Sequence, residues 1–352
     1  MTDASDFPQI VRRLVASLAK TQYTPAEELL HNQRSLLERL IRHARAHVPF
    51  YRDTGRLDAL FKSDDTIHWE NWSQVPLLTR HDIRRAGDAL RSRELPPSHG
   101  EVWSYSSSGS TGESITVLHS DLSNRIVRLA LQLRDFQQHQ IDPTRRLALI
   151  RRYVNEAEEV RREDGWASDL PVMGLRGERF DLPVTWDPDK LMVAIISIRP
   201  DVIHARPSVL RAICSRDTGN DLCKLRIRTA IVVGEQCAEQ ARSQIEQHLG
   251  CPIVNFYSST ECGRIATSCP HCTQFHINAE AIAVEVLNKH GYAARSDEVG
   301  SIIATPLYNY AMPLIRYDHG DEARPGQRDA CKVTLPALAE VFGRRIPGPI
   351  AP

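Results

Sequence analysis

Apolar side chains near the start of the chain recur every three or four positions, the spacing of an amphipathic helix. In SLLERLIRHARAHV five of them share one side of the predicted helix: Leu36, Leu37, Leu40, Ile41 and Ala44. A short helix is predicted after Thr79, a residue type that caps helix N-termini. A further helix is predicted after Asp121 or Ser123, with apolar positions from Ile126 to Phe136.

The pattern is most regular in the centre of the chain, where short apolar runs alternate with amphipathic segments. DVIHA, TAIVVG and PIVNFYS read as strands, and PSVLRAIC and AEQARSQIEQHLG read as the helices between them. Strands separated by helices predict right-handed crossovers and a parallel sheet. Ligands bind beyond the carboxyl ends of such strands, and these ends carry Gly234–Glu235 and Tyr257–Glu261. Further on the chain becomes strand-rich, so we predict an α/β fold with a small β-rich part.

The stretch SYSSSGSTGES lies between two alternating segments, EVWSYSS and ITVLHS, which predict strands on either side of a loop. The two glycines allow backbone N–H groups to converge on an anion, and the hydroxyl groups add donors. No GK[ST] follows, so this is not a Walker A loop. A phosphate-binding loop and a solvated turn remain alternatives.

Two further stretches carry candidate chemistry. In YSSTE, Tyr257 can stack on a flat base, Thr260 can bond to a phosphate and Glu261 can hold Mg²⁺. In RYDHGD, Asp321 follows a glycine and could accept hydrogen bonds from both ribose hydroxyls. The alternatives are a polar turn for the first stretch and a hairpin turn for the second.

Composition narrows the class of protein. Among 352 residues, 44 are Lys or Arg and 44 are Asp or Glu, so no basic excess indicates a nucleic acid or an anionic membrane as partner. The N-terminus lacks the apolar core of a signal peptide, and the run LMVAIISI is too short to cross a bilayer. Eight cysteines without a secretion signal favour a reducing environment. We therefore expect a soluble, cytoplasmic protein.

Cysteine and histidine gather in ECGRIATSCPHCTQFH, which contains Cys262, Cys269, His271, Cys272 and His276. A CxxC followed by a nearby histidine predicts a structural zinc site. The alternative is a set of buried thiols.

Taken together, SSSGSTGES, GEQ, FYSSTECG, PLIRYDHGD and FGRR resemble the adenylate-forming enzymes. HARAHVPFYRD, WSQVPLLTRHDIR and RPDVIHARPSVL narrow the resemblance to the phenylacetate–CoA ligase branch and its capsule-biosynthesis-type relatives. The resemblance extends from about Leu36 to Arg345. It implies the fold of the large N-terminal domain, with parallel βαβ sheets flanked by helices.

The resemblance also implies roles for individual residues. The ATP phosphates would lie in the loop formed by Ser107, Ser108, Gly109, Ser110, Thr111 and Gly112. The adenine pocket would be lined by Gly234, Glu235, Tyr257 and Ser258. Thr260 and Glu261 would serve phosphate and Mg²⁺ during catalysis, Asp321 would bind ribose, and Arg344 would precede the hinge.

The implied reaction joins a small carboxylic acid to AMP from ATP and passes the acyl group to an acceptor. The resemblance implies coenzyme A or another molecule as this acceptor. The alternatives are an amide-forming ligase, in which an amine is the acceptor, and a nucleotide-binding pseudoenzyme or partner subunit without adenylation activity. The resemblance also implies a zinc site, because this branch often has a Cys and a His at this spacing and a later Cys-x-Cys pair. Cys269 and His276 match the first two, and Cys331 matches the second cysteine of the later pair. Asp329 stands where the first cysteine of that pair would be, and Cys272 could take its place as a ligand. These residues predict a closed Cys₃His site with Cys262 in reserve.

Three departures from the family pattern bear on the expected ATP binding and turnover. Glu113 stands where a phosphate-loop lysine is usual, and Ser258 replaces a glycine. The sequence predicts a helical segment at 1–100, the core at 101–345 and a tail at 346–352. A C-terminal lid domain with its lysine is expected to be absent, which puts turnover in question unless a separate chain supplies the lid.

Overall fold

The computed structural model describes residues 6–107, 114–152, 159–327 and 331–345. The chain forms two compact units. The first unit comprises Met1–Gln132, Ser259–Ala266 and His271–Pro352, and the second comprises Leu133–Ser258 and Thr267–Pro270.

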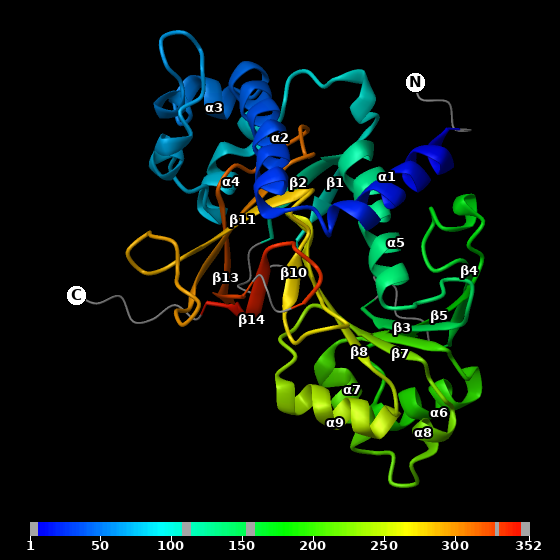
Figure 1. The fold of residues 1–352 in the computed structure, drawn as a ribbon. Helices are drawn as coiled ribbons and strands as arrows, with labels where there is room; N and C mark the ends of the chain where they lie inside the picture. Colours follow the sequence, from blue (N-terminus) through cyan, green and yellow to red (C-terminus); the bar gives the residue numbers. More distant parts are fainter. Residues whose placement is uncertain (1–5, 108–113, 153–158, 328–330, 346–352) are drawn as a thin grey trace. The chain divides into compact units, whose positions relative to one another are not determined.

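The second unit is built on a mostly parallel sheet of strand order β8-β7-β6-β3-β5-β4, in which β4 pairs antiparallel with β5. Its strands are β3 (Leu147–Arg151), β4 (Arg161–Asp164), β5 (Glu178–Pro183), β6 (Val202–Ala205), β7 (Thr229–Val232) and β8 (Ile253–Ser259). Four helices cover one face of this sheet, as Figure 1 shows: α6 (Pro188–Ile198), α7 (Pro207–Cys214), α8 (Asp221–Lys224) and α9 (Glu239–Leu249). The predicted parallel strands β6, β7 and β8, joined by α7 and α9, are confirmed.

The sequence of this unit explains its elements. All four residues of β7 are buried, as expected for a parallel strand covered on both faces. Asp187 caps α6 by accepting a hydrogen bond from the Lys190 amide at 2.9 Å. Gly250 ends α9 in the left-handed conformation, at φ 67°.

The helices of the first unit come mainly from the start of the chain. They are α1 (Phe7–Thr21), α2 (Ala26–His47), α3 (Pro49–Thr54), α4 (Arg80–Ala86) and four short 3₁₀ turns, Asp58–Leu60, Trp69–Gln74, Gly87–Leu90 and Pro97–His99. Leu37, Leu40, Ile41 and Ala44 are buried, which confirms the predicted helix face. Thr79 caps α4, as the sequence predicts, and forms a capping box with Asp82.

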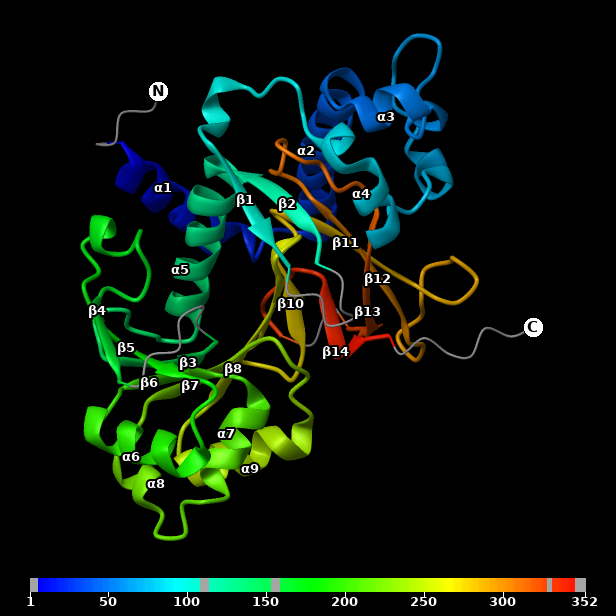
Figure 2. The ribbon, with the colours of Figure 1, turned by 180° about the vertical axis from the view of Figure 1, so that it is seen from behind.

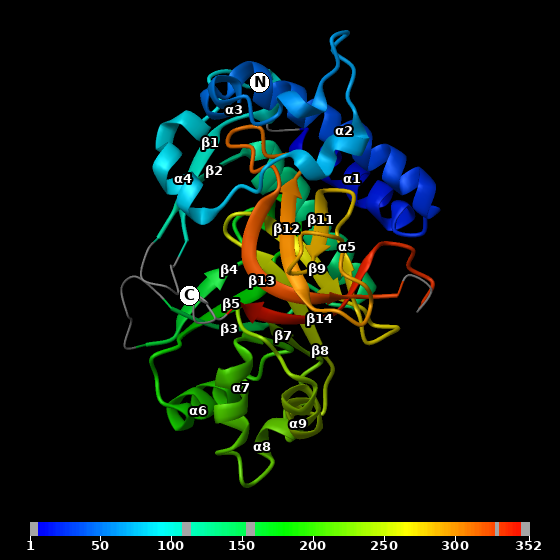
Figure 3. The ribbon, with the colours of Figure 1, turned by 90° about the vertical axis from the view of Figure 1, so that its left-hand side faces the viewer.

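The strands of the first unit form a hairpin and a larger antiparallel sheet. The hairpin pairs β1 (Val102–Ser106) with β2 (Thr116–Ser120), seen in Figure 2. The sheet has strand order β11-β12-β13-β14-β10. Figure 3 shows its strands β11, β12, β13 and β14. Its strands are β10 (Phe275–Ile277), β11 (Ile282–Leu287), β12 (Gly300–Pro306), β13 (Tyr317–Pro325) and β14 (Ala337–Arg344), while β9 (Gly263–Ser268) follows β8 along the chain.

One alternative and one local prediction are not borne out. The alternative that RYDHGD is a hairpin turn is excluded, because residues from Tyr317 onward lie inside the long strand β13. Asp121 does not cap a helix with its side chain; its carboxylate instead accepts hydrogen bonds from the Glu101 amide and Trp103 Nε1. The segment after it is a π-helix, Leu122–Val127, that continues into α5 (Arg128–Gln138).

Among the described helices, none is both long and apolar enough to span a membrane. All eight cysteines lie in the described ranges, and no disulfide joins any of them.

Candidate functional site

Arg80, the first residue of α4, joins two of the motifs found in the sequence. Its Nη1 lies 3.0 Å from Glu261 Oε1, and its Nη2 donates to Ser107 Oγ at 2.7 Å. The Glu261 side chain is only 3% exposed, so its carboxylate has lost most of its water and depends on this guanidinium. The structure thus brings the start of the predicted phosphate loop beside the predicted Mg²⁺ ligand. Ser108, Gly109, Ser110, Thr111, Gly112 and Glu113 lie outside the described residues.

Thr260 is held in place by a histidine that the sequence did not single out. His119, in β2, bonds through Nε2 to the Thr260 carbonyl oxygen at 2.9 Å. Burial lowers the pKa of His119, which favours the neutral ring. Since a carbonyl accepts only, Nε2 carries the proton, and the hydrogen bond fixes the backbone just before Glu261.

Asp321 lies in β13 opposite Arg344 in β14. One carboxylate oxygen, Oδ1, is 3.4 Å from Arg344 Nε, and the other, Oδ2, is 2.9 Å from His319 Nδ1. Gly320 has φ 81°, and a side chain there would meet Arg344 Nη1 at 2.9 Å. The two predicted nucleotide residues Asp321 and Arg344 are therefore neighbours, and His319 is a partner that sequence reasoning missed.

The predicted adenine residues belong to the second unit. Gly234 and Glu235 follow β7. Tyr257 and Ser258 are among the last residues of strand β8 rather than after it. Val232, the last residue of β7, pairs with Asn255, so Gly234 and Tyr257 both come after this last pair, at the carboxyl ends of two neighbouring parallel strands. Glu235 accepts a hydrogen bond from the Ser208 amide at 3.2 Å, at the start of α7.

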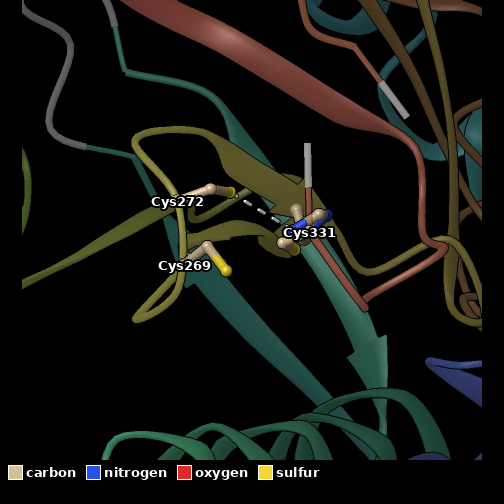
Figure 4. A group of neighbouring side chains, drawn as sticks. Cys269, Cys272 and Cys331 are labelled. Atoms are coloured by element: carbon tan, nitrogen blue, oxygen red, sulfur yellow. Dashed lines mark hydrogen bonds between the residues drawn. The ribbon is translucent and has the colours of Figure 1, made fainter. Parts of the chain in front are cut away.

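The four predicted zinc ligands come together. The ligand atoms of Cys269, Cys272, His276 and Cys331 all lie within 4.8 Å of one another. Figure 4 shows Cys269 and Cys272 on one loop, with Cys331 approaching from another segment. Cys262, the reserve ligand, is not part of this group; it is buried and lines a different cavity.

The geometry of this group suits a tetrahedral metal. His276 Nε2 lies 3.2 Å from Cys331 Sγ and 3.9 Å from Cys272 Sγ. A tetrahedral zinc with ordinary bond lengths separates sulfur from nitrogen by about 3.5 Å. The other ring nitrogen, Nδ1, lies 3.2 Å from the Leu335 carbonyl oxygen, which holds the proton on Nδ1 and turns the Nε2 lone pair towards the sulfurs.

The sequence and the fold of this chain were compared with those of known proteins. No protein-family model matches the chain. Its sequence is 25% identical to phenylacetate-coenzyme A ligase of Thermus thermophilus over 317 residues, 84% of this chain and 66% of that protein. It is 23% identical to Protein CapK of Staphylococcus aureus over 301 residues, 83% of this chain and 62% of that protein. The chain thus spans slightly less than two thirds of these relatives.

The crystal structure of 2-hydroxyisobutyryl-CoA ligase in complex with 2-HIB-AMP and CoA, in its thioesterification state, has the same fold. It superimposes with a TM-score of 0.74 at 18% identity, covering 92% of this chain and 70% of that one. The fold is that of the large N-terminal domain of the adenylate-forming enzymes. In sequence, this chain is similar to phenylacetate-coenzyme A ligase and to Protein CapK.

Proposed function

We propose that this chain activates a small carboxylic acid with ATP and transfers the acyl group to coenzyme A. The observation that carries the proposal is the convergence of Ser107, Arg80 and Glu261, because it joins the phosphate-loop motif to the acidic motif. A buried carboxylate near a serine that begins a glycine- and hydroxyl-rich stretch supplies groups of the kind that hold a metal ion and phosphates.

In the proposed reaction a carboxylate oxygen attacks the α-phosphorus of ATP, and the bond to pyrophosphate breaks. The thiol of coenzyme A then attacks the acyl carbon, and AMP leaves. Thr260 would contact the α-phosphate, Asp321 the ribose and Tyr257 the adenine. Glu261 would hold Mg²⁺, and its carboxylate also bonds to Arg80; when bound, the ion would neutralise phosphate charge.

For the cysteine group we propose a structural zinc ion. Three thiolates and one imidazole fill a tetrahedral site and leave no position for a reacting water. Zinc would connect the loop carrying Cys269 and Cys272 to the segment at Cys331, next to β14. Its role would be stability rather than catalysis.

ATP–pyrophosphate exchange with a panel of acids tests adenylation directly. Product mass with and without coenzyme A then identifies the acceptor: a thioester supports the proposal, whereas an amide formed only with an added amine would replace coenzyme A in it. Nucleotide binding without exchange for any acid would favour a non-catalytic binding protein.

A further inference from the structure

The outer edge of strand β1 carries main-chain groups that the hairpin does not use. Among the described strands β1 pairs only with β2 (Figure 2). The Ser107 amide donates to the Ile115 carbonyl, so every second residue back from Ser107 directs its N–H and C=O groups towards β2. The residues between them direct these groups away from β2, and they are Val102, Ser104 and Ser106. Their main-chain groups form no hydrogen bond with any other described residue.

This edge lacks the features that natural proteins use to prevent pairing between sheet edges. The sequence of β1, VWSYS, contains no charged residue and no proline, and its register with β2 has no bulge. Lysine, proline and bulges are the usual protection of an exposed edge. Val102 is 37% exposed and Trp103 is 44% exposed, so the apolar side chains of the strand face water as well. The edge is therefore suited to pairing with a further strand.

The strand β1 is complementary to a second copy of itself. In an antiparallel pair centred on Ser104, this residue lies opposite the partner's Ser104, and Val102 lies opposite the partner's Ser106. The residues with outward main-chain groups then form all the hydrogen-bonded pairs, with about six bonds in total. Trp103 lies opposite the partner's Tyr105 at a non-hydrogen-bonded position, where side chains are closest and aromatic pairs stabilise a sheet. One register thus satisfies the main chain and pairs the aromatic rings.

The charges next to β1 also favour a second copy as the occupant. Glu101, directly before the strand, is exposed and forms no ion pair with another described residue. In the same register it lies opposite the partner's Ser107. The Ser107 hydroxyl accepts a hydrogen bond from Arg80 Nη2 at 2.7 Å, so each Glu101 carboxylate approaches a guanidinium across the pair. The two Glu101 residues lie at opposite ends of the paired strands, and no like charges meet.

We propose that this chain forms a twofold dimer through β1, in which two hairpins join into one antiparallel sheet of order β2-β1-β1-β2. A sheet of this size with aromatic cross-strand pairs is more stable than an isolated two-stranded hairpin. The dimer goes beyond the proposed function and does not depend on it, because the pairing involves no step of the reaction.

Sedimentation velocity of the full chain tests the dimer. Between about 1 and 100 µM the mean mass should rise from that of one chain to that of two. Ser104→Pro should raise the dimer dissociation constant at least about tenfold, because proline removes the central outward N–H, which the pairing with β2 does not use. Ser104→Thr keeps this N–H and is the matched control. Val102→Lys places a charge on the edge and should weaken the dimer similarly.

Two results would overturn the dimer. One is a monomer at every concentration, and the other is an unchanged dissociation constant in folded Ser104→Pro or in Val102→Lys. If Ser104→Pro does not fold, Val102→Lys decides.

Cross-linking tests the register. In Ser104→Cys the two introduced thiols face each other, with Cα atoms about 5.5 Å apart, a separation that a disulfide spans. Diamide should oxidise them to one disulfide, taking up the two electrons and two protons that the thiols lose. Ser106→Cys lies opposite the partner's Val102 rather than its own copy, and should yield at least about tenfold less cross-linked dimer. The unaltered protein gives the background from its eight cysteines. Equal yields from the two variants would overturn the proposed pairing.

Discussion

Arg80 Nη1 lies 3.0 Å from Glu261 Oε1, although 181 residues separate them along the chain. The carboxylate is nearly inaccessible and the guanidinium is 23% exposed, so the cation shields the acid from one side. A buried charge whose partner is removed is left uncompensated. The pair therefore bears on stability as well as on the proposed metal site.

Replacing Arg80 should reveal this dependence. Arg80→Met is expected to lower the free energy of unfolding by about 3–5 kcal/mol, since Glu261 would stay buried without a counter-charge. Urea denaturation measures the change. Arg85→Met, on the exposed side of the same helix, is the control, and adding Glu261→Gln to Arg80→Met should recover part of the loss. Equal stability of the Arg80 and Arg85 variants would contradict the prediction.

Asp321 is predicted to contribute to nucleotide affinity. Asp321→Asn keeps the shape but removes the charge that would accept ribose hydroxyls, and should weaken ATP binding by about 1.5–3 kcal/mol. Isothermal titration calorimetry measures the affinity. Asp318→Asn alters a carboxylate in the same strand that is paired with Arg345, and serves as the control. Indistinguishable affinities for all three proteins would remove Asp321 from the nucleotide site.

The cysteine group predicts a measurable metal content. Protein purified without added zinc should contain about one zinc per chain, and Cys269→Ser or His276→Ala should lose it. Cys214→Ser and Cys251→Ser are matched controls, because burial raises the pKa of Cys214 to about 11 and that of Cys251 to about 12 and keeps both as thiols. Chelation should lower the melting temperature. An unchanged melting temperature after complete zinc removal would disprove the structural role.

A buried histidine in the first unit predicts a pH effect on stability. Burial, and to a smaller extent the neighbouring His43, lower the pKa of His99 from 6.5 to about 4. The unfolded chain therefore binds more protons than the folded one in this range. Stability should be complete above pH 6.5 and fall as the pH drops towards 4, by about 2 kcal/mol between pH 6.5 and 5.

The variant His99→Gln should flatten this part of the pH profile, measured as the free energy of unfolding from pH 7 to 5. His290→Gln removes an exposed ring and is the control. A slope that is the same in His99→Gln as in the unaltered protein would show that other groups cause it.

Much of the fold can be predicted from sequence because the relevant signals are local. The strands β6, β7 and β8 are short apolar runs, and Pro207 and Gly250 mark helix ends. The four cysteine and histidine positions could be predicted from CxxC spacing together with family resemblance. These signals depend on neighbours within about one helical turn or one strand.

The missed residues depend on contacts between distant segments. Arg80 is one basic residue among 44, and only packing places it beside Glu261. His119 and Thr260 meet across 141 residues. Gly320 suggests a turn in sequence, yet it lies inside β13, where its positive φ accommodates Arg344. No periodicity in the sequence carries this information.

The π-helix at Leu122–Val127 makes the shape of a cavity of about 200 Å³ beside Thr260 depend on the number of residues in the turn. A π turn accommodates one residue more than an α turn, and Asn124 and Val127 reach the cavity from this widened turn. Deleting one residue there would restore an ordinary α-helix and leave the segments on either side in register. A single-residue deletion is therefore expected to narrow the turn that carries Asn124 and Val127 while the residues before and after it keep their orientation.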